Sequence, residues 1–137
     1  MQAELEKNKA TIHQFYHAGV ERRLTAFAEY VDPDFVVRAP NYLPWGGSPK
    51  NATFFRNEVL TNLPRVFDFS RFSYETVTGE DDRVAAVINM GVTGTDDIIK
   101  ILDLWTVRND KVIALWVAYF EPQALLDKLG IAHRLNR

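Results

Sequence analysis

The sequence predicts an α+β fold in which helices cover the concave face of a strongly curved antiparallel sheet. In the first half of the chain, apolar residues recur at spacings of three and four, which is the period of amphipathic helices. From Phe67 onward the period changes to that of β-strands, and short turns separate the strands. Strands joined by short turns run antiparallel. The helices are therefore expected to form a separate layer on one face of the sheet.

Length and composition limit the kind of protein. The 137 residues are 47% apolar and 25% charged, which predicts one globular domain spanning residues 1–137. The net charge of −2, without a basic cluster, argues against nucleic acid or an anionic membrane as a partner. The sequence has no cysteine, no signal-peptide pattern and no apolar run of membrane-spanning length. A cytoplasmic location is the default expectation.

The first half is predicted to contain three helices and one short strand. Apolar residues at positions 12–20 form one stripe of a first helix, and a second helix is expected over residues 21–30. The β-branched segment 35–39 is typical of a strand. The prolines and glycines of APNYLPWGGSP then force a loop. A third helix is expected from Lys50 until Pro64 ends it.

Four long strands are predicted to follow. The turn signals between them lie at residues 79–82, 94–97 and 109–110 and are rich in glycine, aspartate and asparagine. A short last helix is expected with Pro122 in its first turn and Gly130 as its end. The predicted strands span residues 67–78, 83–93, 98–108 and 111–121.

The order of these elements, the loop PWGGSPKNATFF and the segment YFEPQALLDKLG resemble the SnoaL-like and ketosteroid isomerase group of the nuclear transport factor 2-like superfamily. The resemblance covers nearly the whole chain. It implies a cone-shaped fold with a hydrophobic pocket between the helices and the concave face of the sheet. It does not imply one activity, since this fold hosts isomerases, dehydratases, hydrolases, cyclases and non-enzymatic modules.

In the last predicted hairpin one acid, Asp103, lies within a strand among apolar residues. A two-residue turn at positions 109–110 would pair Asp103 with Trp116. On the face of Asp103 we then expect Ile101, Trp105, Ala114, Trp116, Ala118 and Phe120. On the opposite face we expect Leu102, Leu104, Ile113, Leu115, Val117 and Tyr119.

Both faces of this hairpin are apolar, but one layer of helices covers only one of them. The face with Leu102, Leu104, Leu115 and Val117 would be a large exposed apolar patch. We therefore predict a homodimer in which the two sheets pack against each other. Dimers through this sheet are usual in the resembled family.

Asp103 is the main candidate for chemistry. Removing a carboxylate from water raises its pKa, so Asp103 beside tryptophans can stay protonated and donate a hydrogen bond. The resemblance implies the same role, because Asp103 matches the aspartate of the oxyanion hole, which in ketosteroid isomerase is neutral and acts with a tyrosine. The alternative is a buried polar group satisfied by a backbone amide, a tyrosine hydroxyl or an indole.

The resemblance also implies a catalytic base and an oxyanion tyrosine, and these match less well. The base, an aspartate beside a proline after the first strand, falls on Ala39 or Leu43, and the sequence has no acid between positions 34 and 58. Proton abstraction next to a carbonyl therefore lacks its usual base. The tyrosine falls on Ile12, and Tyr16 lies one helical turn later on the same face.

Asp103 and Tyr16 are thus the candidate catalytic residues. We predict a SnoaL-like protein that binds a small, largely apolar, carbonyl-bearing or cyclic molecule, as an isomerase- or cyclase-type enzyme without the usual aspartate base. The alternative is a non-catalytic dimeric binding or interaction module. No cofactor and no metal site are predicted, because His13 and His17 have no third ligand nearby.

Aromatic residues beside the expected pocket are the candidate ligand contacts. For the loop residues Tyr42 and Trp45 the alternative is anchoring of the loop, and for Phe54 it is core packing. The candidates are Tyr42, Trp45, Phe54, Trp105, Trp116 and Phe120.

Overall fold

The structure is a computed structural model that describes residues 2–21 and 29–130 of the chain. It begins with one long helix, α1 (Gln2–Val20), and continues with a six-stranded sheet and several short helices. The predicted second helix, over residues 21–30, falls mostly outside the described residues.

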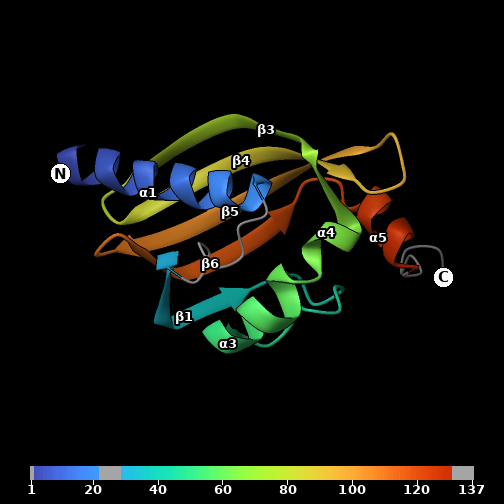
Figure 1. The fold of residues 1–137 in the computed structure, drawn as a ribbon, viewed down its shortest axis with the longest axis horizontal. Coiled ribbons are helices and arrows are strands. Elements are labelled where there is room, and N and C mark those ends of the chain that lie inside the picture. Colours follow the sequence, from blue (N-terminus) through green and yellow to red (C-terminus); the bar gives the residue numbers. More distant parts are fainter. Residues whose placement is uncertain (1, 22–28, 131–137) are drawn as a thin grey trace.

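The sheet is strongly curved and open, with the strand order β2-β1-β6-β5-β4-β3 (Figure 1). The four long strands β3 to β6 form the predicted antiparallel meander. In addition, β1 lies parallel to β6 and antiparallel to β2. The strands are β1 (Val31–Arg38), β2 (Lys50–Asn51), β3 (Phe67–Glu80), β4 (Arg83–Val92), β5 (Ile98–Arg108) and β6 (Lys111–Tyr119).

Strand β1 begins earlier than predicted. The segment after Val31 is an irregularity within the strand, because the register with β6 shifts between Val31 and Val36. The backbone N–H of Asp34 donates to the side chain of Asp32 at 2.8 Å, which is the local bond of an Asx turn. Val31, buried against β6, holds the start of the strand in the sheet.

The predicted third helix is divided into shorter pieces. Residues Lys50–Asn51 form β2, and the Asn51 side chain then accepts a hydrogen bond from the backbone N–H of Phe54 at 2.9 Å, which caps the helical segment. Pro64 does not end a helix but lies in the first turn of α4, where its missing N–H costs nothing. The short helices are α3 (Ala52–Phe54), the π-helix η1 (Phe55–Leu60), α4 (Leu63–Val66) and α5 (Gln123–Leu129).

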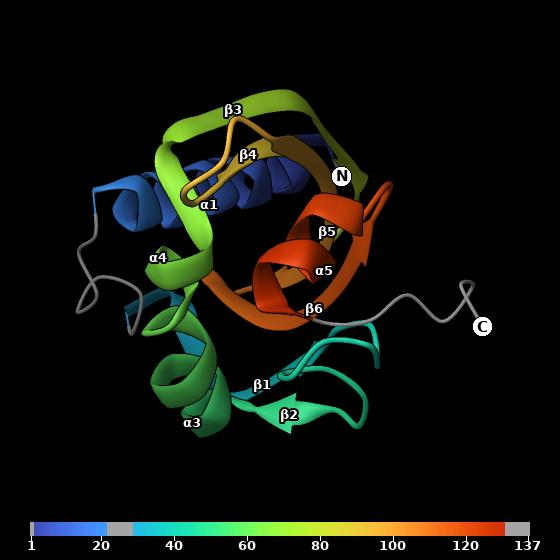
Figure 2. The same cartoon turned by 90° about the vertical axis from the view of Figure 1, so that its right-hand side faces the viewer.

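Helix α1 lies across the concave face of the sheet and contacts β3, β4 and β5 (Figure 1). Its predicted apolar stripe is buried there, with Ile12 and Ala18 fully inaccessible and Phe15 4% exposed. Figure 2 shows the sheet curving around the space between α1 on one side and η1 and α3 on the other. The core therefore sits inside the curve of the sheet.

The turn between β5 and β6 has the predicted position. Asn109 and Asp110 both have positive φ angles, 52° and 64°, as a two-residue hairpin turn requires. Arg108 pairs with Lys111 as this turn demands.

The predicted register of the rest of the hairpin is wrong, because β6 contains a bulge. Val107 pairs with Val112, but Thr106 pairs with Ala114, so one residue of β6 is skipped. Asp103 consequently pairs with Val117 and not with Trp116. Since side chains alternate along a strand, this shift exchanges the two faces of β6 relative to β5.

The exchange decides which side chains share the concave face with Asp103. Leu115, Val117 and Tyr119 line the inside of the curved sheet. Trp116 and Phe120 lie on the outer face and are 56% and 58% exposed. The prediction that these two residues stand on the face of Asp103 is therefore corrected.

Candidate functional site

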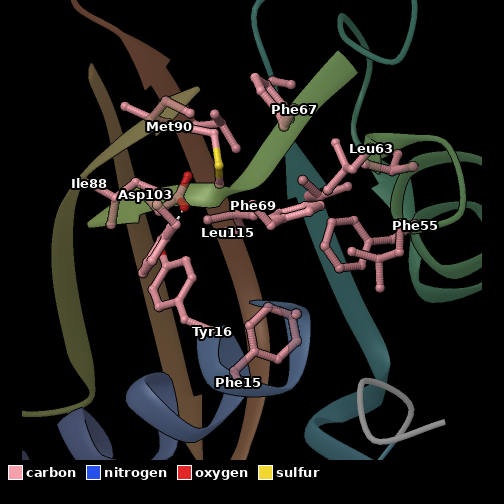
Figure 3. A pocket seen from close by; sticks show the side chains of 18 of the residues that line it. Phe15, Tyr16, Phe55, Leu63, Phe67, Phe69, Ile88, Met90, Asp103 and Leu115 are labelled. Carbon is pink, nitrogen blue, oxygen red and sulfur yellow. Dashed lines mark hydrogen bonds between the residues drawn. The ribbon is translucent and has the colours of Figure 1, made fainter. Parts of the chain in front are cut away.

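The concave face of the sheet encloses a cavity of about 110 Å³. Side chains from α1, η1, α4 and all four long strands form its wall, and almost all of them are apolar (Figure 3). Among the described residues, Asp103 is the only acid in this wall. The wall of the cavity is thus largely apolar and contains one carboxyl group.

Asp103 lies on β5 between two buried neighbours of the same face, Ile101 and Trp105, and is itself only 8% exposed. Burial raises the pKa of its carboxyl group from 3.8 to about 7, and the hydrogen bond from Tyr16 limits this rise. A carboxyl group with this pKa is present in both protonation states near neutral pH. It can therefore accept a proton or donate one there.

Tyr16 contacts Asp103 directly. Its hydroxyl donates to Oδ2 of Asp103 at 2.6 Å and accepts a hydrogen bond from the indole Nε1 of Trp105 at 3.0 Å. Burial, followed by the negative charge of Asp103, holds the pKa of Tyr16 well above its usual value. Tyr16 thus keeps its proton and serves as a fixed donor to the carboxylate (Figure 3).

Neighbouring rings hold Tyr16 in this orientation. Its ring centroid lies 5.4 Å from that of Phe72, 5.8 Å from that of Tyr74 and 5.9 Å from that of Trp105. The contacts with Tyr74 and Trp105 are edge-to-face, which is a favourable arrangement of aromatic quadrupoles. A phenol packed on several sides loses little further entropy when it holds the acid.

The second oxygen of the acid, Oδ1, accepts no hydrogen bond from the described residues. Buried carboxylate oxygens are normally satisfied by protein or water. The alternative was a structural acid whose oxygens both accept hydrogen bonds from the protein. This holds for Oδ2, which accepts from the Tyr16 hydroxyl, but not for Oδ1. Oδ1 is therefore the oxygen of Asp103 that is left without a partner in the described part of the chain.

The structure brings together only part of the predicted set of ligand contacts. Trp105 and Trp45 line the cavity with Asp103 and Tyr16. Gly46 fixes the loop next to Trp45, because a Cβ at this position would overlap the carbonyl oxygen of Pro40.

The other predicted contacts lie away from the cavity wall. Phe54 packs below Lys50, whose Nζ is 5.5 Å from the ring centroid. Trp116, on the outer face, has the guanidinium carbon of Arg38 5.2 Å from its ring centroid. Tyr42 is half-buried beside the core.

Sequence reasoning missed several wall residues. Leu115, Val117 and Tyr119 were placed on the other face because the bulge in β6 was not foreseen. Phe69 and Phe72 were not singled out. They are three positions apart, so a regular strand would place them on opposite faces, but the pairing of β3 with β4 is irregular between Asp68 and Ser73, and both line the cavity. The strand period alone would therefore have found only one of the two.

The position expected for a second catalytic acid is apolar. Ala39 lines the cavity, and Leu43 is buried in the core. Any proton transfer in this cavity by a carboxylate of the described residues therefore involves Asp103.

The histidines of α1 have other contacts. The ring of His13 lies 4.7 Å from that of Tyr74, and Nε2 of His17 is 3.3 Å from the carboxylate of Glu21. In residues 2–21 and 29–130, no group of three or more metal-binding side chains comes together. None of the helices in this part of the chain is long and apolar enough to cross a membrane.

Comparisons with known proteins agree with this architecture. The family model of the SnoaL-like domain matches residues 12–115. A comparison with curated protein sequences gave no significant match.

Solved structures with the same fold cover nearly the whole chain. An NTF2-like protein from Burkholderia xenovorans is 17% identical, with a TM-score of 0.70, over 90% of this chain and 96% of that one. IdmH from Streptomyces antibioticus, a proposed polyketide cyclase, is 17% identical, with a TM-score of 0.71, over 90% and 99% of the two chains. TerC, co-crystallised with polyporic acid, is 20% identical, with a TM-score of 0.75, over 90% and 98%. The predicted nuclear transport factor 2-like fold is confirmed.

Proposed function

Because the chain belongs to the SnoaL-like family, we propose that it binds a small, largely apolar, cyclic or carbonyl-bearing molecule and exchanges a proton with it through Asp103. One observation carries this proposal. An apolar cavity contains a single buried acid, and one oxygen of that acid has no partner among the described residues. Convergent polar groups in an otherwise apolar cavity are typical of small-molecule sites.

The pKa of about 7 suits Asp103 to acid–base chemistry. As a carboxylate it can take a proton from a carbon next to a carbonyl, and as a neutral acid it can return that proton to another atom of the same molecule. Tyr16 and Trp105 would position the acid throughout, because both bonds of the chain Trp105–Tyr16–Asp103 can persist in either protonation state. In this scheme Asp103 acts as the general base in place of the aspartate that is absent at Ala39 and Leu43.

Two structural neighbours support a cyclic ligand. IdmH is a proposed polyketide cyclase, and TerC was crystallised with polyporic acid. Both share the fold with this chain at low identity, so they support the class of ligand without specifying the reaction. Isomerase- or cyclase-type chemistry is the proposal that fits both the neighbours and the single acid.

Filling the cavity should weaken the binding of a small aromatic probe, 2-naphthol. Leu63 lies on the wall, in α4 (Figure 3), so the Leu63→Trp variant should lower the affinity by at least about tenfold by occupying the space. The matched Leu63→Ala variant enlarges the cavity and should retain binding. Calorimetric titration measures both affinities. Equal affinity of the parent and the Trp variant would place the probe elsewhere and remove the support for this cavity as the site.

We also propose that the outer face of the sheet pairs with a second copy of the chain. This face contains Trp116 and Phe120, which are 56% and 58% exposed, beside the half-buried Leu102 and Leu104. Contiguous exposed aromatic and aliphatic side chains are unusual on a monomer. The bulge in β6 changes the composition of this surface from the predicted one, because Trp116 replaces Leu115 and Val117 on it.

The Trp116→Glu variant should dissociate this dimer. In the dimer, the glutamate carboxylate would be removed from water at the centre of an apolar contact, and loss of a central tryptophan typically reduces the binding free energy strongly. We therefore expect the association constant to fall by at least about 30-fold. Sedimentation velocity of the parent, Trp116→Glu and the matched Trp116→Phe measures this. A monomeric parent, or a Glu variant that stays dimeric, would show that this surface is not the interface.

A further inference from the structure

A second tyrosine, Tyr119 at the end of β6, lines the cavity wall. In the hairpin Tyr119 pairs with Ile101, and Asp103 pairs with Val117. Tyr119 is therefore the diagonal neighbour of Asp103 on the same face of the sheet, at a distance of about 7 Å along the surface. The two polar groups lie on adjoining strands and share one apolar enclosure.

No hydrogen bond of the Tyr119 hydroxyl is found among the described residues. This distinguishes it from Tyr16, whose hydroxyl is already engaged with both Asp103 and Trp105. Burial raises the pKa of Tyr119, and its electrostatic interactions with Asp103 and Tyr42 act in the same direction. Tyr119 therefore keeps its proton and has a donor to offer.

The other side chains of the cavity wall limit which molecules can bind between Asp103 and Tyr119. Side chains such as Phe69, Met90 and Leu115 offer only apolar contacts there (Figure 3). A molecule that fills this space needs an apolar body, and each polar atom that it buries needs a partner. The wall offers partners for two oxygens at separate places, Oδ1 of Asp103 and the hydroxyl of Tyr119.

We propose that Tyr119 is a specificity-determining residue that donates a hydrogen bond to a second oxygen of the ligand, while Asp103 binds the first. The favoured ligands are then cyclic molecules with two oxygens on an apolar ring system, such as diketones, hydroxyketones and dihydroxy-aromatics. This inference rests on the proposed function, because it uses the same cavity and the same acid.

A comparison of one-oxygen and two-oxygen probes tests it. The probes are 2-naphthol and a set of dihydroxynaphthalene isomers, titrated calorimetrically into the parent chain, Tyr119→Phe and Tyr30→Phe. Tyr30 is a matched control because its hydroxyl lies outside the cavity and meets Gln14 at 3.5 Å. In the parent, at least one isomer should bind about fivefold more tightly than 2-naphthol, as expected for one added hydrogen bond.

In Tyr119→Phe this gain of the two-oxygen isomer over 2-naphthol should vanish, and Tyr30→Phe should keep the gain. If 2-naphthol binds but the gain survives in Tyr119→Phe, or if no isomer shows a gain in the parent, the inference about Tyr119 is contradicted. The proposed function of the cavity is not contradicted by either result. If neither kind of probe binds the parent, the proposed function fails and this inference fails with it.

Discussion

At about pH 8, the Asp103→Asn variant should be more stable than the parent chain, by roughly 4 kcal/mol. The reason is the rise of the Asp103 pKa from 3.8 in the unfolded chain to about 7 in the folded protein, caused by burial. At this pH the parent must keep a charged carboxylate in an apolar wall, whereas asparagine is neutral and of similar shape. Urea unfolding of both proteins measures the difference.

The sign of this effect depends on pH. Because the folded state holds the proton more tightly, the contribution of Asp103 to stability is fully present below about pH 3.8 and is lost as the pH rises to about 7. The unfolding free energies of parent and variant should therefore lie close together near pH 4 and separate towards pH 8. Asp96→Asn, at an exposed position, is the matched control and should show no such separation. A variant that is less stable than the parent at every pH would make Asp103 a structural acid.

The same substitution should weaken the binding of 2-naphthol by about 10- to 100-fold at about pH 8. In the parent, the phenol donates to the carboxylate oxygen Oδ1, and a hydrogen bond to a charged acceptor is about twice as strong as one between neutral groups. Asparagine can place a neutral amide there but no charge. Calorimetric titration gives both affinities.

The two expected results together separate function from structure. A carboxylate that stabilised the fold would, on removal, lower the free energy of unfolding. A carboxylate that serves a ligand costs stability in the empty protein and contributes to affinity in the complex. A variant that is more stable and binds less well is the outcome that assigns Asp103 to the ligand.

The turns and strand positions could be predicted because the sequence specifies them locally. Asn109 and Asp110 tolerate the positive φ angles of their turn, and Gly130 adopts the left-handed conformation that ends α5. The period of apolar residues on α1 likewise placed Ile12 and Phe15 in the core. Each of these features depends on residues close together in the chain.

The face of β6 could not be predicted because both of its faces are apolar. Hydrophobic alternation normally fixes register, since a slip of one residue would expose the core side chains. Trp116 and Val117 are both plausible neighbours for Asp103, so the pattern permitted either register. The bulge beside Thr106 decides between them, and nothing in the local sequence marks it.

In the candidate site, too, single residues could be predicted from the local sequence, but the contacts between distant residues could not. Asp103 and Tyr16 were identified separately, one as an acid in an apolar strand and the other on the inner stripe of a helix. Their hydrogen bond joins residues 87 positions apart, and it depends on how α1 is rotated and seated on the sheet. Tyr119 was missed because its side of β6 was assigned wrongly.

The most direct test of the central claim is the pH dependence of 2-naphthol affinity in the parent chain and in Asp103→Asn. If Asp103 binds ligands in this cavity, the affinity of the parent should rise as the pH increases through about 7, where the acid ionises, and the affinity of the variant should be lower and independent of pH over this range. Equal affinities with the same pH profile in both proteins would contradict the assignment of Asp103 to a ligand site.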